Sequence, residues 1–281
     1  PVSFIIDYGS EIVLPTEVHL QGINTTLEGL MTGVHHLYVE DETFVSVSST
    51  VQTALLENGV KMSITEEGNF SLPTINVKMC GELEFRRIFS NHFTITAAFL
   101  EIKHKGTILI NHGYIEAGDL DLESEGKINL EGRGYEAGTG PGAGVGSAGG
   151  SYGGQAGGSL SIKAYGSVFT PLELGSGGGD GAGGGFVNLK VGRSLHSDGY
   201  VSALGANASA SNSGGGSGGS ILVQAYNFSG HGTLDASGGR GLGNGGGGSG
   251  GRIATLIGHQ NNFGGQYLAH GGYSSSGPGG P

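Results

Sequence analysis

A row of acidic side chains occupies every second position of residues 119–125, and the row consists of Asp119, Asp121, Glu123 and Glu125. Because they alternate with Leu120 and Leu122, a strand places all four carboxylates on one face. Carboxylate oxygens hold hard cations such as Ca²⁺, and paired carboxylic acids act on polysaccharides. The outer face of any half-buried strand is also polar. We therefore expect a solvated face with no catalytic residue, and at most a weak Ca²⁺ or carbohydrate site. Four acids turned into a cleft beside Arg133 would contradict this expectation.

Four asparagines begin the N-glycosylation motif Asn-X-Ser/Thr, and they are Asn24, Asn69, Asn207 and Asn227. Such a motif receives a glycan only in the secretory pathway and on an exposed part of the chain. We therefore expect a secreted, extracellular glycoprotein in which these asparagines are the candidate glycan sites.

Other reactive residue types lack the spacing that their chemistry needs. Cys80 is the only cysteine, which excludes an internal disulfide and a cysteine-rich zinc site. The histidines show no HExxH spacing, and no GxGxxG string opens a helix after a strand. Asp180 is expected to be a turn residue, because calcium-binding glycine/aspartate repeats need an acid in every repeat. We expect no cofactor.

The elements that must position these residues are strands. Residues 1–98 contain short runs of β-branched and aromatic residues bounded by Gly, Asn, Asp or Pro. From Phe99 to Leu130 the apolar residues alternate, with a glycine near each break. Such strands are too short for hairpins that pack sheet on sheet. They fit an all-β, elongated, right-handed parallel β-helix or solenoid, in which each strand pairs with the strand one turn of the coil away.

The second part of the chain repeats. Units consisting of a glycine tract, an alternating strand, a turn and a second strand start at Gly157, Gly184, Gly218 and Gly250. A unit this small cannot bury its apolar face alone, so stacking on its neighbours must do so. The glycine tracts are either flexible loops or ordered, polyglycine-II-like threads. Their regular recurrence and their near lack of charge favour ordered threads.

Composition divides the chain into two parts. Residues 1–130 contain 11 of the 61 glycines and the whole net charge of −11, with 7 Lys+Arg against 18 Asp+Glu. We expect an acidic β-helical part at 1–130 and glycine-rich repeats at 131–281 that continue the same stack. Nucleic acid is an unsuitable partner because phosphate binding needs a basic face, and no apolar run is long enough for membrane insertion as a helix.

Glycine-rich repeat regions of large secreted animal proteins contain segments similar to GGGSGGSILVQAY, GGGGSGGRIA and YGSVFTPLELGSGGG. Similar segments occur in glycine-rich plant surface proteins. The resemblance covers most of the chain and implies an extracellular, multidomain, matrix or filament-forming parent. The chain begins without Met and ends inside a Gly/Pro tract, so we expect a fragment of a longer polypeptide.

The expected function is therefore that of a structural or adhesive module, with self-association or other chains of an extracellular assembly as partners. Two alternatives stay open, a carbohydrate-binding adhesin and a polysaccharide-acting β-helix enzyme. The adhesin predicts an exposed row of aromatic side chains, for which the candidates are Tyr152, Tyr165, Tyr200 and Tyr226. The enzyme predicts a groove that contains two or three acids and a basic residue.

Overall fold

The structure is a computed structural model that describes residues 93–158 and 164–274 continuously and, before them, separate strand segments. For the earlier segments it defines the backbone, with side chains only at Val77 and Glu82–Glu84. Cys80 and the C-terminal Gly/Pro tract lie outside the described residues. Every described element is a strand, and within the described part of the chain no helix could cross a membrane.

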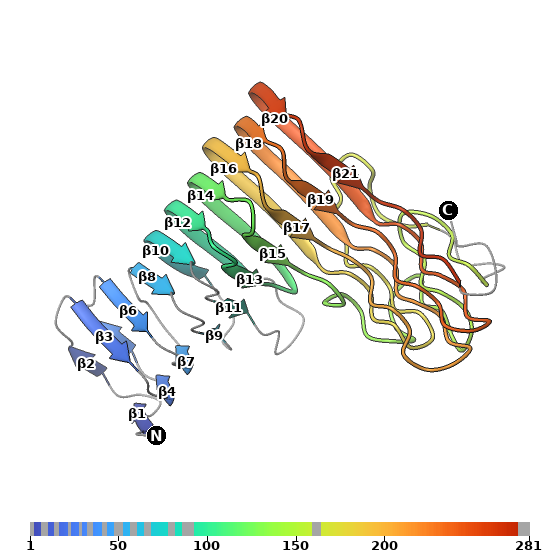
Figure 1. Ribbon diagram of the computed structural model, residues 1–281, viewed down its shortest axis with the longest axis horizontal. Helices are drawn as coiled ribbons and strands as arrows, with labels where there is room; N and C mark the ends of the chain where they lie inside the picture. The colour runs from blue at the N-terminus through green and yellow to red at the C-terminus, as the bar shows by residue number, and fades with distance from the viewer. Residues whose placement is uncertain are drawn as a thin grey trace.

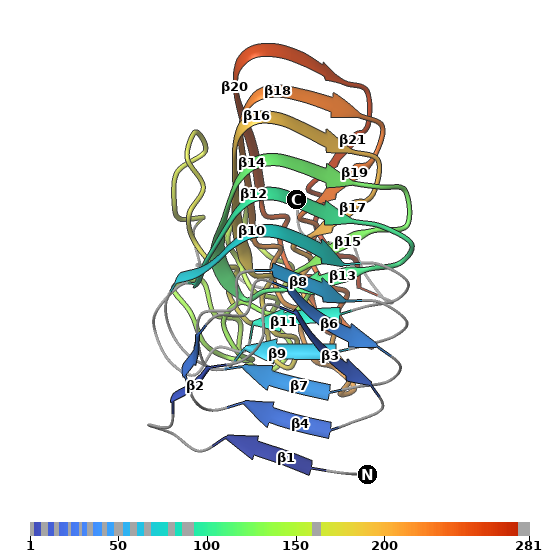
Figure 2. The ribbon, with the colours of Figure 1, turned by 90° about the vertical axis from the view of Figure 1, so that its left-hand side faces the viewer.

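Two sheets of parallel strands make up the fold (Figures 1 and 2). The ten-stranded sheet contains, in spatial order, β1 (Ser3–Ile6), β4 (Asn24–Leu27), β7 (Phe44–Val47), β9 (Lys61–Ile64), β11 (Glu82–Phe85), β13 (Thr107–Leu109), β15 (Lys127–Asn129), β17 (Tyr200–Ser202), β19 (Thr233–Asp235) and β21 (Gln266–Leu268). The nine-stranded sheet contains β20 (Arg252–Phe263), β18 (Ser220–Gly230), β16 (Phe186–Ser197), β14 (His112–Leu122), β12 (Phe93–Ile102), β10 (Asn69–Val77), β8 (Thr53–Leu56), β6 (His36–Glu40) and β3 (Glu17–Gln21). A separate pair is formed by β2 (Glu11–Val13) and β5 (Leu30–Thr32).

From β8 onward, successive strands alternate between the two sheets. We call a long strand and the short strand that follows it a layer, so that β14 with β15 is one layer and β16 with β17 is the next. The strand β14 pairs in parallel with β16, and β15 pairs with β17. Strands from the acidic and the glycine-rich parts of the chain therefore belong to the same two sheets.

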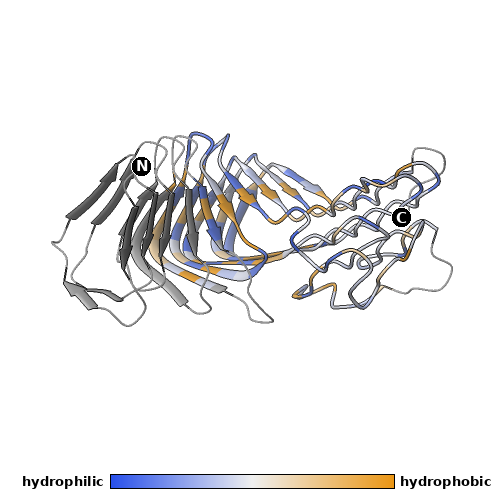
Figure 3. Ribbon diagram, turned by 90° about the horizontal axis from the view of Figure 1, so that it is seen from below, coloured by the Kyte–Doolittle hydropathy of each residue, from blue (hydrophilic) through white to orange (hydrophobic). Residues whose placement is uncertain are grey.

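Apolar side chains at equivalent positions of successive strands form columns in the core. One column contains Leu83, Ile108, Ile128, Val201 and Leu234, which are register partners from β11 to β19. A second contains Ile95, Ile115, Leu189 and Val223, from β12 to β18. All of these side chains are at most 1% exposed. The alternation in the sequence thus places one face of each strand in a shared core. Figure 3 shows the alternation itself as changes of hydropathy along the coloured strands.

Beyond the short strands the chain leaves the sheets in extended, glycine-rich segments, which we call the glycine threads. They lie within residues 131–158, 174–185, 203–219, 236–251 and 269–274, and they form a bundle beside the sheets (Figure 1). The threads are mostly outside any strand, yet backbone hydrogen bonds join them to one another throughout. They are pale in Figure 3, since glycine is neither strongly hydrophobic nor strongly hydrophilic.

The repeat that starts at Gly157 differs from the other three. Its first predicted strand falls largely on residues 159–163, which lie outside the described residues, and residues 164–174 form a loop without a strand. Within that loop Gly166 has a φ of 72°, and Pro171 has no N–H to give to a sheet. Within the described residues, a layer is added by each of the repeats from Gly184, Gly218 and Gly250, namely β16/β17, β18/β19 and β20/β21.

Candidate functional site

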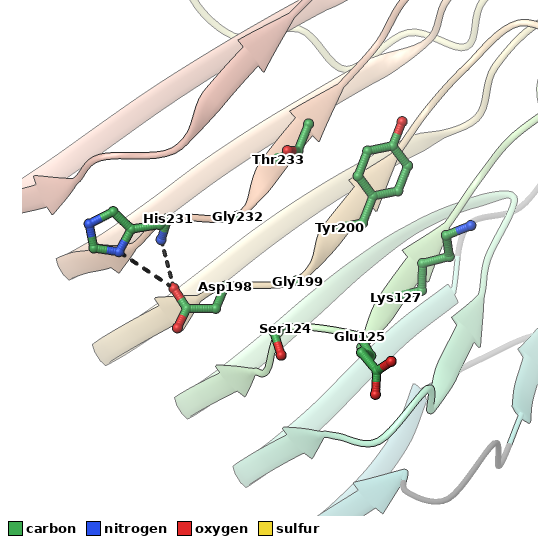
Figure 4. A pocket seen from close by; sticks show the side chains of 10 residues that line it. Ser124, Glu125, Lys127, Asp198, Gly199, Tyr200, His231, Gly232 and Thr233 are labelled. Atoms are coloured by element: carbon green, nitrogen blue, oxygen red, sulfur yellow. Dashed lines mark hydrogen bonds and ion pairs between the residues drawn. The ribbon is translucent and has the colours of Figure 1, made fainter.

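A groove of about 360 Å³ runs across the turns between the long and short strands of three successive layers (Figure 4). Its lining comes from the ends of these turns, and it consists of Ser124, Glu125, Gly126, Lys127, Asp198, Gly199, Tyr200, His231, Gly232 and Thr233. Each layer has a turn at the same place between its long and its short strand. Residues that are far apart in the sequence therefore lie side by side in the groove. The residues that line the groove include carboxylates, an ammonium group, an imidazole and a phenol.

Asp198 is the best-connected side chain of the groove. Its Oδ1 accepts a hydrogen bond of 2.7 Å from the backbone N–H of His231, and its Oδ2 lies 3.1 Å from Nε2 of His196. The backbone hydrogen bond from His231 is the main reason that the pKa of the Asp198 carboxyl lies below its usual value. Asp198 is therefore an ionised hydrogen-bond acceptor held between two histidines.

The opposite wall contains Tyr200 and Lys127, which are register partners in β17 and β15. The Lys127 ammonium lies 5.4 Å from the centroid of the Tyr200 ring, within the range of a cation–π contact. The Tyr200 hydroxyl donates a hydrogen bond of 2.7 Å to Oδ2 of Asp235. These contacts fix the phenol ring in the groove wall.

The acidic row does not converge on a common point. Asp119 pairs with Arg193 on β16, whose Nε lies 3.1 Å from Oδ2 of Asp119. Lys103 lies 2.7 Å from Glu123, 2.8 Å from Glu101 and 3.8 Å from Asp121. Glu125 lines the groove. Among the described His, Cys, Asp and Glu side chains no group of three or more is arranged to hold a metal ion.

Arg133 lies apart from the acidic row. Its guanidinium donates to Asn111 at 2.9 Å and to Glu84 at 2.8 Å. The four acids are thus not turned into a cleft beside Arg133. Three of them lie near basic side chains, Asp119 beside Arg193 and both Asp121 and Glu123 beside Lys103.

Burial of an oxygen distinguishes Asp121 from its neighbours. Its Oδ1 is buried and has no hydrogen-bond partner. Desolvation is the main cause that raises the pKa of this carboxyl, and Lys103 partly opposes the effect.

The tyrosines proposed as an exposed row do not form one. Tyr152 is fully buried, whereas Tyr226 is 51% exposed, and Tyr200 belongs to the groove wall. Tyr165 packs on Tyr152 with 4.7 Å between the ring centroids. The aromatic platform that the adhesin interpretation predicts is therefore not made by these four residues.

Tyr152 connects the glycine threads to the sheets. Its hydroxyl is hydrogen-bonded to Oγ of Ser220 at 2.6 Å, and its ring lies 5.3 Å from the Arg252 guanidinium. Its backbone N–H donates to Oγ of Ser249 at 2.8 Å. The side chain of Tyr152 thus contacts the first residues of β18 and β20. The backbone of Tyr152 is hydrogen-bonded to a glycine thread.

Burial gives the tyrosines a predictable effect on stability at alkaline pH. Desolvation raises the pKa of Tyr152, Tyr165 and Tyr200 in the folded protein, whereas an unfolded tyrosine titrates at about 10. Above about pH 10 the unfolded chain therefore binds fewer protons than the folded one, and the free energy of unfolding falls as the pH rises. We expect the thermal midpoint to fall between pH 9.5 and about pH 11.5.

The variant Tyr165→Phe provides the comparison for this effect. It lacks one of the phenol groups whose pKa is raised in the folded protein. Its thermal midpoint should therefore fall less steeply over the same pH range than that of the wild type. Identical slopes for the two proteins would contradict the assignment.

The most regular structure in the molecule is the thread at residues 213–219. Gly215 and Gly218 donate backbone hydrogen bonds of 3.1 and 2.9 Å to Gly246 and Ser249 of one neighbouring thread. Gly216 and Gly219 donate bonds of 3.0 and 2.8 Å to Ala206 and Ala203, which precede them in the same glycine-rich range 203–219 and run alongside. Both pairs of donors and both pairs of acceptors are three residues apart. This is the periodicity of an extended helix with three residues per turn and no internal hydrogen bonds.

Other threads complete the surroundings of residues 213–219. Further backbone bonds join this thread to residues 146–150, 176, 184 and 239 through Gly150–Gly215, Gly214–Gly146, Ser217–Ser176, Gly184–Ser217 and Gly239–Gly216. Each N–H from Gly214 to Gly219 thus has a backbone partner outside residues 213–219. The thread has no apolar side chain, so these bonds and close backbone contacts hold it in place.

Glycine is required in this thread by the closeness of the neighbouring backbones. A Cβ at Gly216 would lie 1.9 Å from the carbonyl oxygen of Ala182, and one at Gly214 would lie 1.9 Å from that of Ala148. Serine occurs where a side chain can bond to a neighbour. Ser217 accepts a hydrogen bond of 2.8 Å at its Oγ from the backbone N–H of Ser176.

The candidate glycan sites differ in their surroundings. Asn207 is exposed, and its Oδ1 accepts a bond of 2.7 Å from the N–H of Arg240. Asn227 is half-buried on β18, with Oδ1 at 3.2 Å from Nδ1 of His259. Asn24 and Asn69 lie in β4 and β10, where their side chains are outside the described residues.

Sequence reasoning did not find the groove or the pair of His196 and Asp198. The histidines are scattered along the chain, and no local motif marks them. A signal was nonetheless present, since Asp198 and His231 occupy the same turn of two successive repeats. Aligning the units at their turns would have brought these residues together.

Comparison of the chain with protein-family models, with curated proteins and with solved structures gives no match.

Proposed function

We propose that the chain is a rigid structural and adhesive module of a larger extracellular protein. In this proposal the two parallel sheets are walls of an elongated, right-handed β-solenoid, and the glycine threads pack beside it as polyglycine-II helices. The protein would act through its stiffness and its packing surfaces. Its partners would be further copies of the chain or other chains of an extracellular assembly.

The observation that carries this proposal is the hydrogen bonding of residues 213–219. A helix with three residues per turn directs successive N–H groups about 120° apart. Successive N–H groups must therefore find their acceptors on different neighbouring segments. Two of the three donor directions keep the same neighbour at the third residue, since Gly215 and Gly218 donate to residues 246–249 and Gly216 and Gly219 donate to residues 203–206. In the third direction, Gly214 and Ser217 donate to two different segments, at Gly146 and Ser176. Ordering glycine costs more backbone entropy than ordering any other residue. In the bundle, nearly every backbone amide of this thread is hydrogen-bonded to a neighbouring segment. Such a bundle should resist bending in several directions, which supports a mechanical role.

Extracellular localisation is supported by the exposed motif at Asn207 and by the chain's charge. A net charge of −11 keeps an extended surface soluble. It also disfavours association with nucleic acid, whose phosphates need basic partners.

A second candidate function, carbohydrate binding, is favoured by the groove alone. Glu125 and Asp198 offer acceptors, Lys127 and His231 offer donors, and Tyr200 offers a fixed aromatic ring. Hydroxyl-rich ligands are recognised by such mixtures of polar groups with an aromatic surface. A polysaccharide-acting enzyme stays an alternative, because the groove contains two acids, Glu125 and Asp198, and the basic residue Lys127.

Electron microscopy combined with sedimentation velocity tests the structural proposal. We expect elongated particles that associate further as the protein concentration rises. Gly216→Ala should abolish the association, because it disturbs the thread bundle, whereas Gly192→Ala on the open face of β16 should not. Compact monomers at all concentrations, together with Asp198-dependent binding on a saccharide array, would favour the second candidate instead.

A further inference from the structure

We propose that Ser229, His196 and Asp198 form a nucleophile, a general base and an orienting carboxylate, and that they give the protein hydrolytic activity toward small O-acyl esters. Asp198 lines the groove. Ser229 and His196 lie beside the groove and are not among its lining residues. The proposal does not rest on the structural role proposed above. A test can therefore contradict the proposed ester hydrolysis without contradicting the proposed mechanical role, and the reverse is also true.

The three side chains form a continuous hydrogen-bonded chain on the outer face of the nine-stranded sheet. Ser229 of β18 is the register partner of His196 of β16, and its Oγ lies 3.2 Å from the imidazole Nδ1. On the other side of the ring, Nε2 lies 3.1 Å from Oδ2 of Asp198. Both distances are within the reach that a nucleophile and its base require.

The direction of each hydrogen bond follows from Asp198. The backbone N–H of His231 bonds its Oδ1 at 2.7 Å, which favours the ionised carboxylate, an acceptor only. Nε2 of His196 must therefore be the donor in that pair. In the neutral imidazole Nδ1 is then the acceptor. The Ser229 hydroxyl has two acceptors in reach, the carbonyl oxygen of Leu195 at 3.5 Å and the nearer Nδ1 at 3.2 Å, and in this proposal it donates its proton to Nδ1. This is the protonation state that activates a serine.

A hydrogen-bond donor for the developing oxyanion is available in the next layer. Asn262 of β20 is the register partner of Ser229 and is exposed. Its side-chain amide carries two N–H groups. An amide donor beside a nucleophile can stabilise the tetrahedral intermediate of acyl transfer.

The open position of these residues determines the substrate class. His196 and Asp198 are 47% and 38% exposed at their side chains, so among the described residues they stay open to solvent. Large acyl chains would gain no contacts there. We therefore expect esters with short acyl groups, whose alcohol part can extend into the adjoining polar groove.

The reaction balances with water as the only co-reactant. Oγ of Ser229 forms a bond to the acyl carbon as its proton moves to Nδ1 of His196. The bond from that carbon to the alkoxy oxygen then breaks, and the leaving alkoxide takes the proton from His196. Water attacks the acyl-serine in the same way, which releases the carboxylic acid and restores Ser229.

Covalent labelling with a fluorophosphonate probe tests the proposal, because Oγ displaces fluoride when it is activated. The full chain is produced without glycosylation, since Ser229 also belongs to the motif of Asn227. We expect the adduct on the peptide that contains Ser229, and none there in Ser229→Ala. The labelling rate should fall about 100-fold in His196→Gln, the size expected for loss of a general base.

Ser194→Ala is the matched control, because Ser194 is exposed on the same face of β16 without a histidine partner. Its labelling rate and its burst of 4-nitrophenol from 4-nitrophenyl acetate should equal those of the wild type. Labelling that is as fast in His196→Gln as in the wild type would overturn the proposal, as would an adduct on Ser194 as readily as on Ser229. Unchanged thermal midpoints show that each variant is folded.

Discussion

Replacing Gly216 by alanine is expected to destabilise the protein by about 3 kcal/mol, at the upper end of the usual cost of overpacking. The new Cβ would lie 1.9 Å from the carbonyl oxygen of Ala182 and 2.4 Å from its carbon. Both atoms belong to a backbone that is itself hydrogen-bonded, with the N–H of Ala206 donating to Ala182 at 2.8 Å. The neighbour cannot rotate away as a side chain would, so whole threads must separate. Chemical denaturation monitored by circular dichroism measures the change.

Gly192→Ala is the control for this effect. A Cβ at Gly192 meets only the carbonyl oxygen of Ala117, at 3.8 Å, which is an ordinary contact. Because alanine also has less backbone freedom than glycine when unfolded, this variant should be neutral or more stable by up to about 1 kcal/mol. Equal destabilisation by the two substitutions would show that the threads are not closely packed.

Removing the side chain of Tyr152 is expected to cost about 4 kcal/mol, as for other large aromatic side chains deleted from a core. The ring is fully buried, packs against Tyr165 and lies under the Arg252 guanidinium. Tyr152→Phe keeps the ring and loses only the hydrogen bond to Ser220, so it should cost about 1 kcal/mol. Urea denaturation of the wild type and both variants gives the two values.

Tyr273 provides the comparison, because it is 55% exposed and contacts mainly Arg240. Tyr273→Ala should change the free energy of unfolding by less than about 1 kcal/mol. If Tyr152→Ala were as mild as Tyr273→Ala, the connection between threads and sheets that we assign to Tyr152 would be wrong.

Strands and their parallel pairing were predictable from the sequence because the strand period is visible in it. The alternation around Leu120 and Leu122 places those leucines in the core, at about 1% exposure each. The repeats from Gly184, Gly218 and Gly250 each become one layer. In the repeat from Gly157 the second strand was predicted wrongly, since residues 164–174 contain no strand, whereas its first strand falls largely on residues outside the described part of the chain.

Composition and local motifs did not predict the groove and its charged residues, because contacts between layers depend on register. The pairing of β14 with β16 and of β16 with β18 shifts at Ala117/Leu120 and at Val191/Ser194. Each shift changes which outer residues meet, and it brings Arg193 to Asp119 and His196 to Ser229. A one-residue difference in register would reverse the side on which these side chains lie, and composition alone carries no such information.

Amide hydrogen exchange in the threads tests the central claim most directly, because it distinguishes packed glycine from a flexible loop without any substitution. If residues 214–219 are bonded as described, their amides should exchange as slowly as those of the adjoining strand β18, which open only when the fold opens. The loop at residues 164–173 serves as the fast-exchanging reference within the same chain. Exchange of residues 214–219 at the rate of that loop would contradict the thread bundle and the structural function proposed from it.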